Sequence, residues 1–173
     1  MAIARVRLIS RSLGLPLNYA TTRKLKPQRE AARLVRVGRA PDDGKLIRLT
    51  PRAAAAWRRL REAAAREGIE LLPLSGFRSV ARQTEIIRAK LAAGQPLAAI
   101  LRVNAAPGYS EHHTGRALDL GTSGHEKLDA GFARTAAFRW LARRAGEFGF
   151  RLSYPRRNRH GIAYEPWHWC WQP

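Results

Sequence analysis

Two short segments of the chain combine residue types that can hold a divalent metal ion. The first reads SEHHTGRALD and contains His112 and Asp119, and the second reads YEPWHW and contains His168. Two imidazoles and one carboxylate suit a catalytic zinc ion, which keeps a fourth position for water and lowers the pKa of that water to about 7. Glu165, close before His168 in the chain, is a spare carboxylate that can take the proton of this water. The two segments together therefore predict metal-assisted hydrolysis.

The surroundings of the two acidic residues bear on this chemistry. Asp119 lies between Leu118 and Leu120, and a carboxylate in such an apolar setting needs a partner, which a metal ion would provide. Glu165 adjoins Pro166 and a group of tryptophans, so burial should raise its pKa toward the range of a general base. The alternative for Glu165 is an ordinary ion pair with one of the many arginines.

The remaining histidines and the single cysteine are weaker candidates. His113 points away if its neighbour binds the metal, so it is interpreted either as a residue that supports a metal ligand or as a structural one. His125 and His160 lie in turn-like segments and are interpreted as solvated. Cys170 is two positions from His168 on a predicted strand, about 7 Å away, which is awkward for sharing one ion. We interpret it as a small buried hydrophobic residue.

The composition is that of one folded, strongly basic domain. The chain has 173 residues, of which 45% are hydrophobic, so a globular fold with a real core is expected. Lys and Arg total 32 against 13 Asp and Glu, for a formal net charge of +19. Such a charge attracts polyanions, whether nucleic acid, anionic lipid or an anionic wall polymer. A single cysteine excludes an intrachain disulfide.

The compartment is left open by the sequence. The early arginines are not followed by an apolar stretch of about 7–15 residues, so no secretory signal is predicted. No run of about 20 apolar residues predicts a transmembrane helix. These features favour the cytoplasm, whereas the substrate considered below would place the protein at the cell envelope or in the periplasm.

The chain divides into a basic N-terminal extension, residues 1–50, and a catalytic domain, residues 51–173. We expect the extension to be an extended arm with short strands over residues 4–9 and 45–49. Thr50 and Pro51 are typical of a helix start, and helices are predicted over residues 51–67, 79–93 and 135–148. The predicted strands lie at 69–74, 150–154 and 163–171. Helices early and strands late predict an α+β fold with an antiparallel sheet.

The final predicted strand has a clear two-residue periodicity. Trp167, Trp169 and Trp171 would share the core face, which leaves His168 on the opposite face, toward a cleft. A regular strand would place Glu165 and His168 on opposite faces. A kink at Pro166, which has no N–H to donate to a sheet, would let both side chains approach one metal ion.

Three separated motifs closely resemble the VanY-like zinc D-alanyl-D-alanine carboxypeptidases, over roughly residues 70–171. They are Ser75-Gly76-Phe77-Arg78-Ser79 with Gln83, then Ser110-x-His112-x-x-Gly115-x-Ala117-x-Asp119, and then Glu165-Pro166-Trp167-His168. The resemblance implies a small antiparallel sheet with helices packed mainly on one side, the fold shared with the Hedgehog signalling domain.

The resemblance also implies a role for each matching residue. The zinc ligands would be His112, Asp119 and His168, and Glu165 would be the catalytic base. Arg78 would polarise the scissile carbonyl or stabilise the developing oxyanion, and Ser110 and Gln83 would line the substrate pocket. The cofactor would be Zn²⁺, and the substrate a peptidoglycan stem peptide ending in D-Ala-D-Ala.

Two other functions compete with this one. A D,D-dipeptidase or a peptidoglycan endopeptidase would use the same scaffold. A basic module that binds nucleic acid would use the positive charge, with the tryptophans stacking on bases. A serine-type hydrolase is disfavoured, because the sequence has no Gly-x-Ser-x-Gly and no Ser-x-x-Lys motif.

Overall fold

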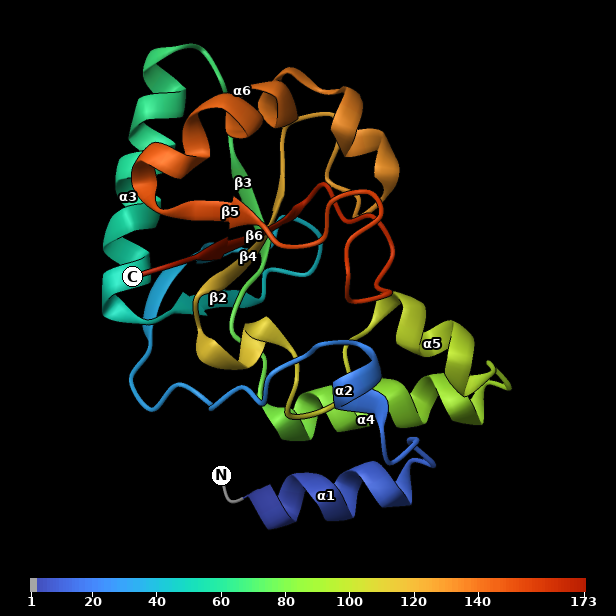
Figure 1. Ribbon diagram of the computed structural model, residues 1–173. Coiled ribbons are helices and arrows are strands. Elements are labelled where there is room, and N and C mark those ends of the chain that lie inside the picture. Colours follow the sequence, from blue (N-terminus) through green and yellow to red (C-terminus); the bar gives the residue numbers. More distant parts are fainter. Residues whose placement is uncertain (1–2) are drawn as a thin grey trace.

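The computed structural model describes residues 3–173 and has an α+β architecture (Figure 1). The α-helices are α1 (Ile3–Ser12), α2 (Tyr19–Thr22), α3 (Pro51–Arg66), α4 (Val80–Ala92), α5 (Leu97–Val103) and α6 (Ala136–Arg144). The short 3-10 helices are η1 (Glu111–Thr114), η2 (Ala130–Arg134) and η3 (Ala145–Phe148). Within residues 3–173, no helix has the length and apolar character needed to cross a membrane.

The strands form two antiparallel sheets, as the predicted fold class requires. A hairpin is made by β1 (Val35–Arg39) and β2 (Leu46–Leu49). The larger sheet has the order β3 (Leu72–Ser75), β4 (Ala117–Gly121), β6 (His168–Trp171) and β5 (Phe150–Leu152). Buried side chains of α3 and α6 join those of β4, β5 and β6 in the main core, while α4 and α5 lie below the sheet in the view of Figure 1. The α+β prediction is therefore confirmed.

The register between β4 and β6 separates the core from the functional side chains. Leu118 pairs with Trp169, and both are buried in the main core. The next pair, Asp119 and His168, faces the other side of the sheet because side chains alternate along a strand. The predicted separation of the tryptophan face from His168 is thus confirmed.

Three helix starts lie where the sequence predicted them. Pro51 is the first residue of α3. The side chains of Ser79 and Thr135 accept hydrogen bonds from the backbone N–H groups of Arg82, at 3.0 Å, and of Phe138, at 3.1 Å. These contacts satisfy N–H groups that have no partner within the helix.

Other local expectations were wrong. Residues 4–9 lie in α1 and not in a strand, since Ile9 and Leu13, four positions apart, both pack against the cluster around Ile87 and Ile100. Helical spacing, and not alternation, brings these two side chains to the same surface. His125 and His160, both interpreted as solvated, are half-buried, and Nδ1 of His160 lies 2.9 Å from a backbone carbonyl oxygen. The last strand is limited to β6, and β1, β4 and α5 were not predicted.

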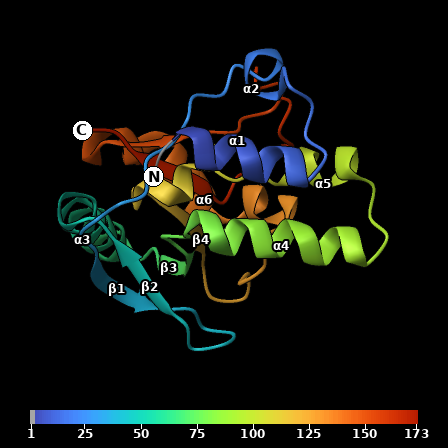
Figure 2. The same cartoon turned by 90° about the horizontal axis from the view of Figure 1, so that it is seen from below.

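Residues 13–34, here called the N-terminal strap, pack across the loop that precedes η1. Tyr19 is buried, and its hydroxyl accepts a hydrogen bond from the N–H of Ala106 at 3.0 Å. The N–H of Gln28 donates to the carbonyl of Gly108 at 2.7 Å. Seen from below, α1 lies alongside α4 and α5 (Figure 2). A domain boundary at residue 50 remains a prediction, and the contacts across it are extensive.

The strap also reaches the residues around Arg78. The carboxylate of Glu30 accepts a hydrogen bond from the N–H of Val80, the first residue of α4. The N–H of Ala31 donates to the carbonyl of His113 at 2.8 Å. The strap therefore helps to fix the two backbone segments that carry the proposed site residues.

Replacing Tyr19 by Phe should lower the free energy of unfolding by about 1–3 kcal/mol, because the buried N–H of Ala106 loses its acceptor. Urea unfolding of the two proteins measures this difference. Tyr109→Phe is the matched control, since Tyr109 packs against Tyr19 at a ring-centroid distance of 5.6 Å and its hydroxyl has no hydrogen bond among residues 3–173. Equal effects of the two substitutions would contradict the role given to the strap.

Candidate metal centre and its cleft

All seven residues that the sequence singled out line one cleft. The cleft has a volume of about 260 Å³ and lies on the side of the sheet opposite the main core. The seven are Arg78, Gln83, Ser110, His112, Asp119, Glu165 and His168. They come from three separate motifs of the sequence, and the fold brings these motifs together.

The His112 ring is anchored to the backbone of the loop that follows β3. It lies in η1, and its Nδ1 is 2.7 Å from the carbonyl oxygen of Gly76. A carbonyl oxygen can only accept, so Nδ1 carries the hydrogen and Nε2 faces Asp119. A Cβ on Gly76 would lie 2.8 Å from the carbonyl oxygen of Arg48, which explains why glycine occupies this close approach.

The end of η1 depends on a second glycine. Gly115 has a φ of +62°, in the left-handed region that favours glycine, and its N–H donates to the carbonyl of His112. A Cβ there would lie 2.9 Å from Leu34 Cδ2, in the strap. Gly115 thus lets the chain turn directly from His112 into β4, which carries Asp119.

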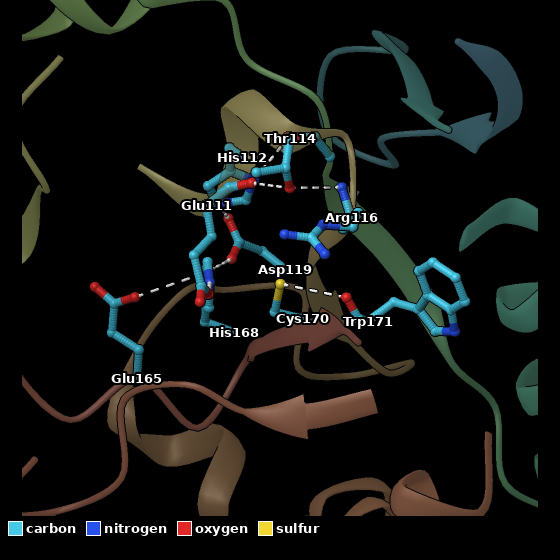
Figure 3. Close-up of polar contacts among 10 residues, drawn as sticks. Glu111, His112, Thr114, Arg116, Asp119, Glu165, His168, Cys170 and Trp171 are labelled. Carbon is cyan, nitrogen blue, oxygen red and sulfur yellow. Dashed lines mark hydrogen bonds and ion pairs between the residues drawn. The ribbon is translucent and has the colours of Figure 1, made fainter. Parts of the chain in front are cut away.

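Asp119 lies between the two imidazoles (Figure 3). Its Oδ2 is 3.2 Å from His112 Nε2, and its Oδ1 is 3.0 Å from His168 Nδ1. One ligand atom from each of the three residues lies within 4.8 Å of the other two, and all three residues are buried. Burial opposes the charge of Asp119, yet the charges and hydrogen bonds of both histidines hold its pKa well below its usual range. The carboxylate is therefore ionised.

This set of donors fits a divalent metal. Two imidazole nitrogens and one carboxylate oxygen are the ligand types of catalytic zinc sites. Burial lowers the pKa of His112, which favours the neutral ring that a metal requires. Burial likewise opposes the charge of His168, but hydrogen bonds with Asp119 and Glu111 raise its pKa to about 10. A cation would compete with the proton for Nδ1 of His168.

Glu165 reaches the same cleft through a tight turn. The N–H of His168 donates to the carbonyl of Glu165 at 3.1 Å, with Pro166 at the second position of the turn, where its fixed φ is favoured. Glu165 Oε2 consequently lies 3.9 Å from His168 Nδ1. Burial raises the pKa of Glu165 to about 7, although the nearby His168 acts in the opposite direction. The prediction that a kink at Pro166 brings the side chains of Glu165 and His168 close together is confirmed.

Arg78 follows β3, and its guanidinium is held in place by a hydrogen bond to Gln83. It donates to Gln83 Oε1 at 2.9 Å, and Gln83 Nε2 donates to the carbonyl of Ala105 at 2.7 Å. The backbone N–H of Arg78 donates to the carbonyl of His112 at 3.2 Å. Ser110 is buried in the same wall. The guanidinium is thus held in place for a carboxylate or a developing oxyanion.

His113 supports Arg78 from behind, and its structural interpretation is confirmed. The ring is fully buried, its Nδ1–H donates to the carbonyl of Arg78 at 2.6 Å, and its Nε2 accepts from the N–H of Gly108 at 3.1 Å. Burial lowers the pKa of His113 to about 4, so the ring is neutral. Cys170 is also buried, as expected of a small hydrophobic residue.

Two residues near the cluster were missed. Glu111 Oε2 lies 3.0 Å from His168 Nε2, and Tyr154 packs its ring against that of His168 at a centroid distance of 4.9 Å. Burial opposes the charge of Glu111, but the hydrogen bond and charge of His168 lower its pKa to about 2. The only signal for Glu111 in the sequence is its position next to His112.

Comparison with known proteins shows which family the chain belongs to. The profile of the VanY family, described as D-alanyl-D-alanine carboxypeptidase, matches residues 46–173. The chain belongs to this family. The resemblance stated from the motifs is thereby confirmed.

Individual VanY relatives agree with this assignment. The YodJ protein of Bacillus subtilis is 33% identical over 165 residues, which cover 93% of this chain and 57% of that protein. The chain therefore spans little more than half of this relative. The structure of the LdcB LD-carboxypeptidase matches with a TM-score of 0.74 at 31% identity, over 82% of this chain and 69% of that chain. A Zn(II) complex of a variant of the D,D-pentapeptidase VanY, from a VanB-type resistance cassette, matches with a TM-score of 0.64 at 27% identity, over 85% of this chain and 82% of that chain.

Zinc should bind with one ion per chain and raise the thermal midpoint. At a free zinc concentration of 100 times Kd the stabilisation would be about 2.7 kcal/mol. Asp119→Asn should abolish this binding, because it removes the charged ligand between the two imidazoles. Calorimetric titration with metal analysis measures both effects. His125→Ala, which removes a histidine outside the cluster, should bind zinc as the unmodified chain does. Undiminished zinc binding by Asp119→Asn would rule out this site.

Proposed function

We propose that this chain is a zinc-dependent D-alanyl-D-alanine carboxypeptidase that removes the terminal D-alanine of peptidoglycan stem peptides. One observation carries the proposal: a buried His–Asp–His cluster shares a cleft with a glutamate of raised pKa and an oriented arginine. Membership in the VanY family supports the substrate class, and the Zn(II) complex of a VanY relative supports the choice of metal.

In this proposal His112, Asp119 and His168 hold the metal. When bound, zinc would supply Lewis-acid activation of water and of the scissile carbonyl. Glu165 accepts the proton of the attacking water and delivers it to the leaving amine, a role that suits a carboxyl with a pKa near 7. Arg78 stabilises the negative charge that develops on the carbonyl oxygen.

Gln83 and Ser110 complete the substrate side of the cleft. Gln83 fixes Arg78 through the 2.9 Å hydrogen bond and so orients the charge that faces the peptide. Ser110 presents a buried side chain to the same space. No nucleophilic side chain is used, so the reaction is direct attack by water with no acyl-enzyme.

A D,D-dipeptidase or an endopeptidase on the same scaffold would use the same residues and differ only in the length of peptide accepted. An N-acylated pentapeptide, free D-Ala-D-Ala and a cross-linked stem peptide therefore distinguish the three, with products identified by mass spectrometry. Release of D-alanine from the pentapeptide alone is the expected result.

Nucleic-acid binding is disfavoured as the main function by the position of the aromatic residues. Trp57, Trp140 and Trp169 are buried in the main core, where they cannot stack on bases. The net charge of +19 still fits electrostatic attraction to an anionic polymer.

Glu165→Gln should lower kcat by about 10²–10⁴-fold, because the amide cannot accept the proton of water. Zinc content should stay at that of the unmodified chain, since Glu165 is not one of the three proposed ligands. The rate of D-alanine release and the metal content are measured on the same samples. An unchanged rate with zinc bound would show that another group acts as the base.

The pH dependence of kcat/KM should follow the protonation of Glu165. The carboxyl must be ionised to accept a proton, and burial raises its pKa to about 7. The rate should therefore rise with pH through about 7 and level off above it. Zinc occupancy is measured across the same range, because protonation of the histidines would also release the metal. A flat profile at constant occupancy between about pH 5.5 and 8 would contradict the assignment.

A further inference from the structure

Each ring nitrogen of His168 faces a different carboxylate. Nδ1 lies 3.0 Å from Asp119 Oδ1, on the side of the proposed metal, and Nε2 lies 3.0 Å from Glu111 Oε2 (Figure 3). His112 has a comparable arrangement, with Nε2 toward Asp119 and Nδ1 on the carbonyl of Gly76. Each imidazole therefore has one nitrogen toward the cluster and one on an acceptor outside it.

Glu111 and Glu165 both approach His168, but they line different spaces. Glu165 lines the catalytic cleft together with Arg78. Glu111 lines a separate cavity of about 490 Å³, formed by the strap and the segment around Ser153, and is absent from the wall of the cleft. A peptide held in the cleft would thus meet Glu165, whereas Glu111 faces the other cavity.

The position of Glu111 on η1 couples the two imidazoles. Glu111 is the first residue of η1 and adjoins His112. The hydroxyl of Thr114 donates to the carbonyl of Glu111 at 2.6 Å and accepts from the N–H of Arg116 at 3.1 Å, so this turn is closed by its own side chain. One short turn consequently supplies a ligand, His112, and the hydrogen-bond partner of a second ligand, His168.

We propose that Glu111 is a positioning residue that accepts the Nε2–H of His168 and so directs the Nδ1 lone pair of that ring toward the metal. The inference rests on the metal site proposed above. Carboxylate partners of metal-bound histidines fix the ring tautomer and raise the basicity of the ligand, and their loss typically costs about 10–100-fold in metal affinity. Here the carboxylate would also resist rotation of the ring, since η1 is anchored independently.

The test is the zinc affinity of Glu111→Ala and Glu111→Gln, measured by competition with a chromophoric chelator. Glu111→Ala should raise Kd for zinc by about 10–100-fold. Glu111→Gln should recover much of the affinity, because the amide oxygen can still accept from Nε2–H. Glu85→Ala, which removes an exposed glutamate from α4, is the matched control and should leave Kd unchanged. At saturating zinc, Glu111→Ala should keep KM and most of kcat, whereas Glu165→Gln should lose kcat without losing zinc.

A merely structural role for Glu111 gives a different pattern. In that case Glu111→Ala would lower the thermal midpoint of the zinc-free chain and leave Kd for zinc unchanged, which would overturn the proposal. Nitrogen-15 NMR of the histidine rings gives an independent reading: the zinc-loaded chain should show His168 protonated at Nε2, and if Glu111→Ala does not fold, Glu111→Gln should show the same tautomer. Protonation of His168 at Nδ1 would also overturn it. Failure of the proposed function is distinct, because the unmodified chain would then bind no zinc or release no D-alanine.

Discussion

The structure depends on one ionised carboxylate buried between two imidazoles. Isolating a charge from water is costly, so Asp119 requires partners that the fold must deliver. The antiparallel register of β4 and β6 sets His168 directly opposite Asp119, and η1 delivers His112 from the other side. The same register sends Trp169 into the core, so the packing that stabilises the sheet also aligns the polar cluster. A divalent cation is the partner that best matches this arrangement.

Around this centre, similar side chains acquire different properties from their surroundings. Burial raises the pKa of Glu165 to about 7, whereas hydrogen bonding with His168 lowers that of Glu111 to about 2 despite burial. Pairs of titratable groups whose environments separate their pKa values are characteristic of acid–base sites. One carboxyl is suited to exchange a proton, and the other stays ionised as a fixed acceptor. The two glutamates differ in this way because Glu111 lies at Nε2 of His168 and Glu165 lies nearer Nδ1.

The sequence predicted the cleft better than it predicted the parts that support it. The seven cleft residues lie in three compact motifs whose residue types indicate their chemistry, and the two-residue periodicity of the last strand placed His168 correctly. Glu111 and His113 were not recognised as partners of His168 and Arg78, because those contacts cross tens of residues. The N-terminal helix was missed for the same reason, since Ile9 packs against a cluster that includes Ile87 of α4 and Ile100 of α5. Tertiary packing, and not local propensity, determines these features.

X-ray absorption at the zinc edge of the zinc-loaded chain is the most direct test of the central claim, that three distant side chains share one ion. The account predicts two imidazole nitrogens at about 2.0–2.1 Å and oxygen ligands at about 2.0–2.2 Å, with loss of one imidazole in His168→Ala. A sulfur ligand at about 2.3 Å, which would indicate Cys170, or a spectrum unchanged by His168→Ala, would contradict it.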